Sequence, residues 1–513
     1  MLEHLLSAYP WVLLGGVQQG EHKELLSSFW KAYRWEHGSH AVYQLAEENK
    51  VNLECTIPLA LHGDGGRTQK KQPLEVVSMC PVLGLDTLQQ PMTCSCENSH
   101  TYSGKRKRSP FAQRLNLKNT SYATHFLVFA YPSKKFKKTP GLFQSLLRVM
   151  SESLREVCEN GLDCNYGGNT YHFNFAILGM KGDQEFHQKT GLLSRSYMNV
   201  GYKNPIPCCS DCLAGGPGVP FEDSSLQAVW RSTVCQQAPW NRVPPFEAIQ
   251  FEDWTSGEAS RFFKRDVFHI FRLGIARNFI GSALVLLCFG GYFDDAPPYG
   301  IEDHLGRAWA NFMLWCAAHS VSPSGIRSFS KQKIHMPTMG TFPWVGCKAS
   351  DTILLLKWMR FFTNLKISAG DANSDLKLIA GACDNGLKFQ GIYRHGLWLK
   401  NSCREKLMAN CQRFTTAYAK LAASALRQNM QLFAMVPKFH SFDHVKVDLE
   451  PCNGQIVYLN PAAWCCSMSE DFIGRVSRQS RRVSYIKVME STLLAYKVKA
   501  RFLLGRLKKA RGL

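Results

Sequence analysis

The chain has 513 residues, of which 45% are hydrophobic and 20% charged, a composition that excludes a mostly disordered polypeptide. Its net charge of +21 is concentrated in two stretches. Residues 101–151 hold eleven basic and no acidic residues, and residues 474–513 hold twelve basic residues and one acid. Localised positive charge of this size predicts a polyanionic partner.

The cysteines and the apolar segments bear on the compartment. The 19 cysteines, an odd number spread along the chain, predict reduced thiols in an intracellular protein and not a disulfide framework. Residues 1–20 contain no basic region, and Pro10 interrupts their apolar run, so no signal peptide is expected. The longest uncharged apolar stretch, 278–293, is shorter than the roughly 20 residues that span a bilayer. We expect a buried helix there and no membrane partner.

The elements predicted between residues 50 and 200 follow the order strand, strand, strand, helix, strand. Apolar runs predict the strands, and apolar residues at helical spacing predict the helix; the ranges are 57–62, 74–79, 124–130, 142–157 for the helix, and 171–180. The first strand is expected to end in a Gly-rich turn at 63–66. The helix permits a parallel crossover to the last strand.

The second half of the chain is predicted to be mainly helical. A Gly- and Pro-rich loop at 203–220 precedes it, helices are expected between 300 and 435, and 471–513 is expected to form one or two basic amphipathic helices. The predicted fold class is α/β, with a mixed sheet, a large helical insertion and a helical basic tail.

Two aspartates occupy equivalent local positions. Asp64 and Asp183 each follow a glycine at the end of a predicted strand. Strand ends lie at the rim of a sheet, where sites are usually built, so the two carboxylates converge if these strands are neighbours. Paired carboxylates bind Mg²⁺, and two such ions support phosphodiester cleavage. The alternative is that each aspartate is only a turn or helix-cap residue.

Short motifs then follow in a fixed order along the chain. They are His-Gly-Asp-Gly at 62–65, Lys-Gly-Asp at 181–183, Asp-x-x-His at 266–269, Pro-Lys-x-His-x-x-x-His at 437–444 and Ser-Glu-Asp-Phe at 469–472. In this order they resemble cut-and-paste DDE/D transposases with an RNase H-like core. The closest resemblance is to a transposase-like family of dinoflagellate genomes, related in pattern to CACTA/Plavaka-like transposases. It covers about residues 55–500.

The resemblance implies an activity and a set of metal ligands. Asp64, Asp183 and Glu470 would hold two Mg²⁺ or Mn²⁺ ions, with Asp471 as the competing third ligand; other acids available for that place are Glu302, Asp303 and Asp266. The implied reaction is DNA strand cleavage and strand transfer in the nucleus, on double-stranded transposon ends and target DNA, by a protein that can form a homo-oligomer. The alternatives are an inactive, domesticated or truncated transposase that binds nucleic acid, and an RNase H-like nuclease.

Histidines and cysteines supply further candidates. The resemblance implies that Asp266 and His269 lie near the active site or support the core, and the alternative is a local pair that orients the ring. It gives His440 and His444 a structural or DNA-positioning role, and zinc binding by them is conceivable. Cys209-x-x-Cys212 is half of a tetrahedral Zn²⁺ site. Candidates for the other half are Cys94, Cys96, Cys235 and His187.

Two basic clusters are expected to contact DNA phosphates. They are Lys105, Arg106, Lys107 and Arg108, also readable as a nuclear localisation signal, and Arg475, Arg478, Arg481 and Arg482. The alternative for either cluster is a solvated helix face. The predicted domains are an N-terminal segment at 1–54, a core at 55–295 with a basic insertion at 86–121 and a Cys-rich loop at 203–220, a helical insertion at 296–460, and a closing segment at 461–513.

Overall fold

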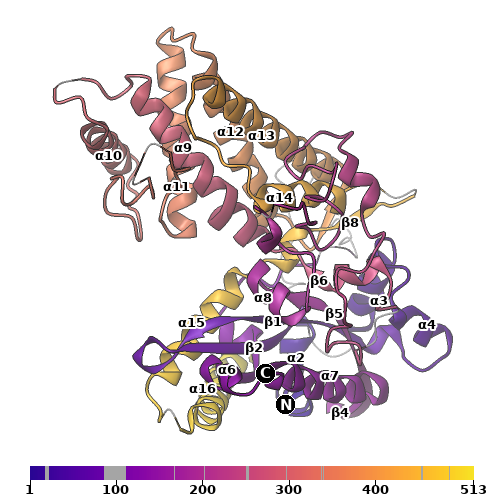
Figure 1. Ribbon diagram of the computed structural model, residues 1–513. Helices are drawn as coiled ribbons and strands as arrows, with labels where there is room; N and C mark the ends of the chain where they lie inside the picture. The colour runs from indigo at the N-terminus through magenta and orange to yellow at the C-terminus, as the bar shows by residue number, and fades with distance from the viewer. Residues whose placement is uncertain are drawn as a thin grey trace, which may run out of the picture.

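A computed structural model gives the fold of the chain. It describes residues 1–17, 22–85, 111, 113–166, 168–201, 203–249, 253–295, 297–336, 338, 340–451, 454–484 and 486–512. Figure 1 shows a sheet flanked by helices in the lower half of the view and a group of long helices in the upper half. The protein is therefore a mixed α/β structure with a separate helical part.

The main sheet has the strand order β3-β2-β1-β5-β4, with β6 added beside β5. The strands are β1 (Thr56–Arg67), β2 (Pro73–Pro81), β3 (Phe126–Pro132), β4 (Leu162–Tyr166), β5 (Asn169–Lys181) and β6 (Phe263–Lys264). Strands β1, β2 and β3 are antiparallel, whereas β5 runs parallel to β1. Helix α7 (Leu142–Asn160) makes the crossover. The predicted order of elements is confirmed, with β4 as a strand that was not predicted.

The turn predicted after the first strand is wrong. Strand β1 continues to Arg67, and Asp64 and Gly66 pair with Val76 and Leu74 of β2. Antiparallel pairing keeps this glycine-rich stretch extended. Its glycines allow close packing instead: a Cβ on Gly63 would lie 2.0 Å from Cζ of Phe186. Asp64 is therefore inside a strand and does not follow one.

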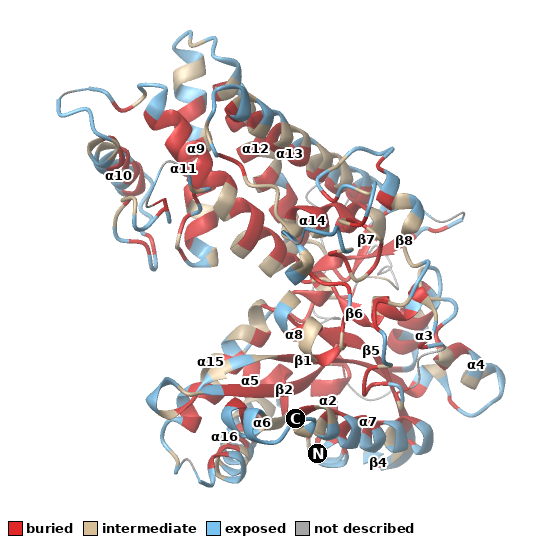
Figure 2. Ribbon diagram, viewed as in Figure 1, coloured by how far each residue is buried: buried red, intermediate tan, exposed pale blue. Residues whose placement is uncertain are grey.

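Helices from both ends of the chain cover the sheet. From the N-terminal end come α1 (Leu2–Ala8), α2 (Pro10–Leu13), α3 (His22–Tyr33) and α4 (Ala41–Glu47). Helices α15 (Ser467–Ser480) and α16 (Val488–Ala510) pack against β2 and β3 through an apolar cluster that includes Leu74, Val76 and Leu127. Short helices complete this part: α5 (Ser121–Thr124), α6 (Ser133–Lys138) and α8 (Gln184–Thr190). Figure 2 shows the sheet and the helix faces that meet it as buried.

The helical part follows β6. A π-helical segment, η6 (Phe268–Ile275), continues into the buried helix α9 (Ala276–Phe289). The remaining elements are α10 (Ile301–Ala318), α11 (Ala349–Ser368), α12 (Ser374–Phe389), α13 (Asn401–Arg427), α14 (Pro437–Asp448) and the strand pair β7 (Trp398–Lys400) and β8 (Val457–Leu459). Among the described residues, Phe268–Phe289 is long and apolar enough to span a membrane, but 78% of its most apolar window is buried, as in a core helix.

Candidate metal centres

Three side chains from distant parts of the sequence meet beside the sheet. Asp64 extends from β1, His269 from η6 and Glu470 from the first turn of α15, and one ligand atom of each lies within 4.8 Å of the other two. All three are half-buried. A carboxylate pair with an imidazole in this spacing can hold a divalent cation. We call these residues the carboxylate centre.

Asp183 lies beside the carboxylate centre at the end of β5. It is the N-cap of α8, and its Oδ1 accepts a hydrogen bond of 2.7 Å from the backbone N–H of Phe186. Asp183 therefore has the helix-cap role that the sequence left open as an alternative. Because β1 and β5 are parallel, Asp183 is near enough for its charge to act on Asp64 and Glu470. Asp183 does not join the group whose ligand atoms all lie within 4.8 Å of one another, so of the three predicted ligands the structure brings Asp64 and Glu470 together in that group, with His269 as its third member.

The two carboxyl groups of the carboxylate centre affect each other. Burial raises the pKa of Asp64, and the charge of Asp183 adds to that effect. Burial and a hydrogen bond with Asp64 raise the pKa of Glu470 to about 10. Two carboxyls in contact cannot both ionise at low cost, so they share a proton when no cation is bound. A divalent cation removes this repulsion, and the donor set therefore fits a metal ion.

Asp266 holds the ring of His269. Its Oδ2 lies 2.6 Å from Nδ1 of His269, and its Oδ1 accepts hydrogen bonds from the N–H groups of Phe268 and Cys466 at 2.9 and 3.0 Å. The carboxylate is fully enclosed, so these bonds occupy it. On the other side of the ring, Nε2 of His269 lies 3.6 Å from Oε1 of Glu470. The contact between Asp266 and His269 therefore orients the imidazole ring, which is the alternative that the sequence left open for these two residues. The oriented ring belongs to the carboxylate centre.

The other acids considered for the third ligand lie elsewhere. Asp471 accepts hydrogen bonds of 2.7 Å from both Ser121 Oγ and Arg475 Nε. Glu302 accepts from the N–H of Lys331, and Asp303 accepts from that of Gly300 at the start of α10; neither belongs to the metal-ligating groups of the described residues. Glu470 alone of these candidates reaches Asp64.

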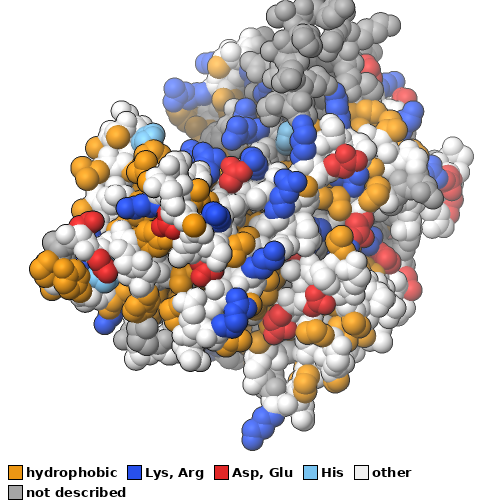
Figure 3. Space-filling view, turned by 90° about the horizontal axis from the view of Figure 1, so that it is seen from above, with side chains coloured by type: hydrophobic (Ala, Val, Ile, Leu, Met, Phe, Trp, Pro, Cys, Tyr) orange, Lys and Arg blue, Asp and Glu red, His pale blue; other side chains and the backbone are white. Residues whose placement is uncertain are grey.

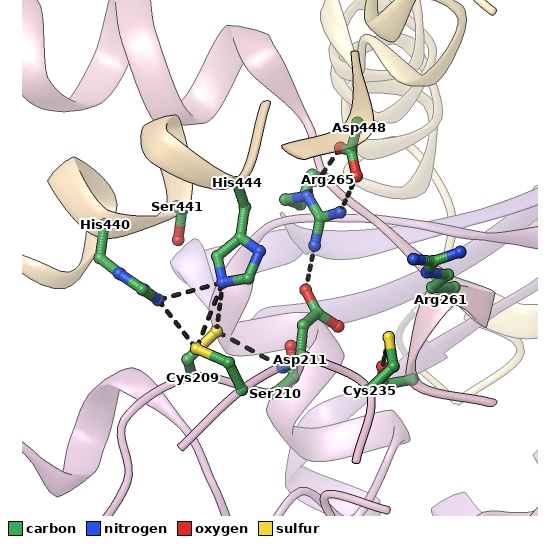
Figure 4. A network of polar contacts seen from close by, with 12 residues as sticks. Cys209, Ser210, Asp211, Cys235, Arg261, Arg265, His440, Ser441, His444 and Asp448 are labelled. Carbon is green, nitrogen blue, oxygen red and sulfur yellow. Dashed lines mark hydrogen bonds and ion pairs between the residues drawn. The ribbon is translucent and has the colours of Figure 1, made fainter. Parts of the chain in front are cut away.

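A second group joins the Cys-rich loop to α14. Cys209, Cys212, His440 and His444 are all buried, and their ligand atoms lie within 4.8 Å of one another. Cys212 Sγ lies 3.2 Å from His440 Nε2, Cys209 Sγ lies 3.4 Å from His444 Nε2, and the two Nε2 atoms are 3.1 Å apart. Figure 4 shows both sulfurs and both nitrogens pointing into one centre. We call these four residues the Cys₂His₂ centre.

The partner of the Cys-x-x-Cys pair is thus the His-x-x-x-His pair of α14. Cys235 and His187 lie outside the group, and Cys94 and Cys96 lie outside the described residues. Of the roles that the sequence left open for His440 and His444, metal binding is the one that this geometry favours, and a structural role is compatible with it. The spacing of both pairs is typical of zinc sites, and this signal could have been read from the sequence. Their separation of more than 200 residues obscured it.

Arg265 ties the Cys₂His₂ centre to the sheet. It follows β6, and its guanidinium makes ion pairs with Asp211, inside the Cys-x-x-Cys segment, and with Asp448 at the end of α14 (Figure 4). The next residue is Asp266, which holds the ring of His269 in the carboxylate centre. A cavity of about 60 Å³ lies between the two centres and is lined by residues of both. The two centres are therefore neighbours in the fold.

The predicted basic clusters have different outcomes. Lys105, Arg106, Lys107 and Arg108 lie outside the described residues. Arg475, Arg478 and Arg482 line a cavity of about 530 Å³ between α15 and α16, and Arg481 Nε donates to the carbonyl of Arg67 at 3.2 Å. The second cluster therefore lies on the helix that carries Glu470.

Comparisons with models of protein families and with curated protein sequences give no match to this chain. The fold and the two centres define its class: a mixed α/β protein with two groups of side chains that can each hold a metal ion.

Proposed function

We propose that the protein is a transposase-like enzyme that cleaves and joins DNA strands at a two-metal centre on an RNase H-like core. The observation that carries the proposal is the close approach of Asp64 and Glu470, whose ligand atoms lie within 4.8 Å of each other, with the charge of Asp183 acting on both. The two residues are 406 positions apart in the sequence. The strand order supports it, because three antiparallel strands, a crossover helix and a strand parallel to the first are what such a core requires.

The residues of the carboxylate centre have distinct tasks in this proposal. Asp64, Asp183 and Glu470 would hold Mg²⁺ or Mn²⁺, and the bound ions would supply activation of a water or a 3′-hydroxyl and stabilisation of the leaving oxygen. His269 directs Nε2 toward Oε1 of Glu470 at 3.6 Å, and Asp266 holds the ring of His269 in that orientation. Both alternatives from the sequence, a nucleic-acid-binding protein without catalysis and an RNase H-like nuclease, differ from this proposal in their activity on DNA.

A cleavage assay with matched variants tests the proposal. The purified protein is incubated with labelled double-stranded DNA while Mg²⁺ or Mn²⁺ is titrated. We expect metal-dependent nicking or joining, reduced at least about 100-fold in Asp64→Asn and in Asp183→Asn, because each change removes an anionic ligand. The exposed Asp295→Asn serves as the control.

Three results would contradict the proposal. They are the absence of metal-dependent cleavage or joining on every DNA, activity unchanged in Asp64→Asn, and cleavage restricted to RNA or hybrid substrates. Binding of DNA without cleavage would favour the inactive, domesticated protein, and cleavage of hybrids alone would favour the nuclease.

We also propose that the Cys₂His₂ centre holds a structural Zn²⁺ ion. Four buried ligands form a closed set, which is typical of structural sites. Tetrahedral bonds of the usual Zn–N and Zn–S lengths place ligand atoms about 3.3–3.8 Å apart, close to the observed spacing of 3.1–3.4 Å. Although burial opposes it, a hydrogen bond from Cys212 and the charges of the two histidines lower the pKa of the Cys209 thiol, and the thiolate is the form that binds metal.

Elemental analysis of variants tests the zinc ion. We expect about one Zn²⁺ per chain, lost in Cys212→Ser and kept in the control Cys235→Ser, whose thiol lies outside the centre. Chelation should lower the melting temperature of the wild-type protein and of the control. Zinc that stays stoichiometric in Cys212→Ser, or is missing from protein purified with zinc present, would refute the assignment.

A further inference from the structure

A cavity of about 970 Å³ lies among α11, α12 and α13 of the helical part, and no residue of either metal centre lines it. Its walls carry Lys357, Arg360, Lys388, Arg394, Lys406 and Arg413, and Arg272 lines it from η6. Among the described residues that line it, Glu405 is the only acid. We call this cavity the basic groove. Figure 3 views the molecule from the helical end, and Lys and Arg side chains lie across the middle of that face.

Most of the positive charge in the basic groove is not neutralised. Asp384 pairs with Arg360 at 3.2 Å and with Lys388 at 2.6 Å. The other four wall cations are exposed and make no ion pair with an acid of the described chain; they are Lys357, Arg394, Lys406 and Arg413. Clustered cations repel one another, and this cost is offset when a polyanion binds.

The floor of the basic groove leads toward the carboxylate centre. Arg272 follows His269 by three positions on η6, and its guanidinium lies 4.2 Å from the centroid of the Tyr393 ring. Its Nε donates to Oε1 of Gln390 at 2.6 Å, and the Nε2 group of that buried amide has no hydrogen-bond partner in the described chain. The floor of the basic groove and His269 of the carboxylate centre are therefore carried by the same π-helical segment, η6.

We propose that the basic groove binds the sugar–phosphate backbone of a DNA strand that extends from the carboxylate centre. The origin of that strand rests on the proposed function. Five of the six wall cations come from α11, α12 and α13, and the six spread along the walls, an arrangement that suits a chain of phosphates better than one phosphate group. The volume is also at the upper end of the about 300–1,000 Å³ of small-molecule pockets. Lysine and arginine contacts of this kind provide affinity and position without choosing a sequence.

Two double variants of α13 test the proposal. Lys406→Gln with Arg413→Gln removes two exposed charges from the basic groove. Lys420→Gln with Arg427→Gln removes one lysine and one arginine at the same spacing from exposed positions that do not line it. Binding of a double-stranded DNA of unrelated sequence is measured by fluorescence anisotropy over a range of salt concentrations, with Asp64→Asn present in all proteins to prevent cleavage. Circular dichroism melting checks that each variant is folded.

The groove variant should bind DNA about tenfold or more weakly at about 0.1 M salt, and the slope of log K against log salt should fall by about 2, since each lost phosphate contact removes about 0.9. The control variant should bind as the parent protein does. Equal affinities and slopes in the two double variants would overturn the proposal. Saturation of the groove by micromolar tripolyphosphate without loss of DNA binding would overturn it too, in favour of a small polyphosphate ligand. If the groove variant binds DNA more weakly and the wild-type protein shows no cleavage, the groove is a DNA-binding site and the proposed catalysis is refuted.

Discussion

At the scale of single residues, Asp266 matters through the ring that it holds. Its carboxylate accepts two backbone N–H groups and faces Nδ1 of His269, so the ring can present only Nε2 to Glu470. Although burial opposes both shifts, the pairing lowers the pKa of Asp266 and raises that of His269. Partners of this kind orient the groups that contact a metal, and their loss typically costs 10- to 100-fold in activity.

The variant Asp266→Asn tests this positioning role. The amide oxygen can still accept from the backbone, but the negative charge of the Asp266 carboxylate beside His269 is lost, so the pKa of His269 in the metal-free protein should fall. DNA cleavage should fall by about 10- to 100-fold. Titration of the His269 ring by NMR and single-turnover rates provide the two measurements. A purely structural aspartate would change the melting temperature while leaving the His269 titration where it was, and that outcome would refute the role.

The sequence identifies some of these residues better than others. Asp64 and Asp183 can be found because each follows a glycine after an apolar run, although only Asp183 lies at a strand end in the fold and Asp64 lies inside β1. The sequence does not show which of Glu470 and Asp471 is the ligand, because adjacent positions in a helix differ only in the direction in which their side chains point. Packing of α15 on β2 and β3 sets that direction and leaves Asp471 with Ser121. The place of His269 also depends on this long-range contact.

At the scale of elements, the site depends on how closely β1 approaches α8. Gly63 lies against the buried ring of Phe186, and Phe186 follows the N-cap Asp183 by three positions. A side chain at Gly63 would push apart the two elements that carry Asp64 and Asp183. Gly65, two positions along the same strand, has open space where its Cβ would be.

The pair Gly63→Ala and Gly65→Ala separates this contact from the general effect of glycine. Gly63→Ala should lower the free energy of unfolding by about 1–3 kcal/mol, the usual cost of overpacking, and should reduce cleavage as the aspartates separate. Gly65→Ala should change stability by less than about 1 kcal/mol. Denaturant titrations of both proteins give the comparison. Equal losses of stability in the two variants would show that the approach to Phe186 is not what constrains this strand.

Local signals explain which elements were predicted. The sequence predicts β1, β2, β3 and β5 from their apolar runs and α7 from the spacing of its apolar residues. These elements bury the same side chains that define the pattern. The glycines after residue 62 signal a turn locally, but pairing with β2 overrides that signal. Strand β4 is short and rich in polar residues, and it exists because it forms a hairpin with β5.

At the scale of the whole molecule, both ends of the chain return to the sheet. Lys508 Nζ donates to the carbonyl of Ala8 at 3.2 Å, and the guanidinium of Arg511 lies 4.7 Å from the ring of Trp11. No local pattern predicts such contacts, because they join segments about 500 positions apart. The same holds for the Cys₂His₂ centre, where the loop and α14 each supply half of the ligands. Composition and charge indicated a polyanionic partner, but the basic groove assembles only in three dimensions.

Glu36 makes another long-range contact of this kind. It follows α3, and its Oε1 accepts hydrogen bonds from the N–H of Leu459 in β8 at 2.6 Å and from Nε2 of Gln455 at 2.9 Å. Burial raises the pKa of Glu36 to about 7 from its ordinary value of 4.5. The folded protein therefore binds a proton here more tightly than the unfolded chain does. This preference stabilises the fold fully at low pH, and it is lost as the pH rises from about 4.5 to about 7.

Replacement of Glu36 by Gln removes this dependence, because the amide is neutral at every pH and its oxygen can still accept from Leu459. The free energy of unfolding of Glu36→Gln, relative to wild type, should rise by about 3 kcal/mol between pH 4.5 and pH 7.5. Urea titrations at several pH values measure the difference, and the exposed Glu47→Gln serves as the control. A constant difference between Glu36→Gln and wild type over this range would mean that the carboxyl titrates alike in the folded and unfolded chains. The contact between the N-terminal helices and β8 would then be independent of pH.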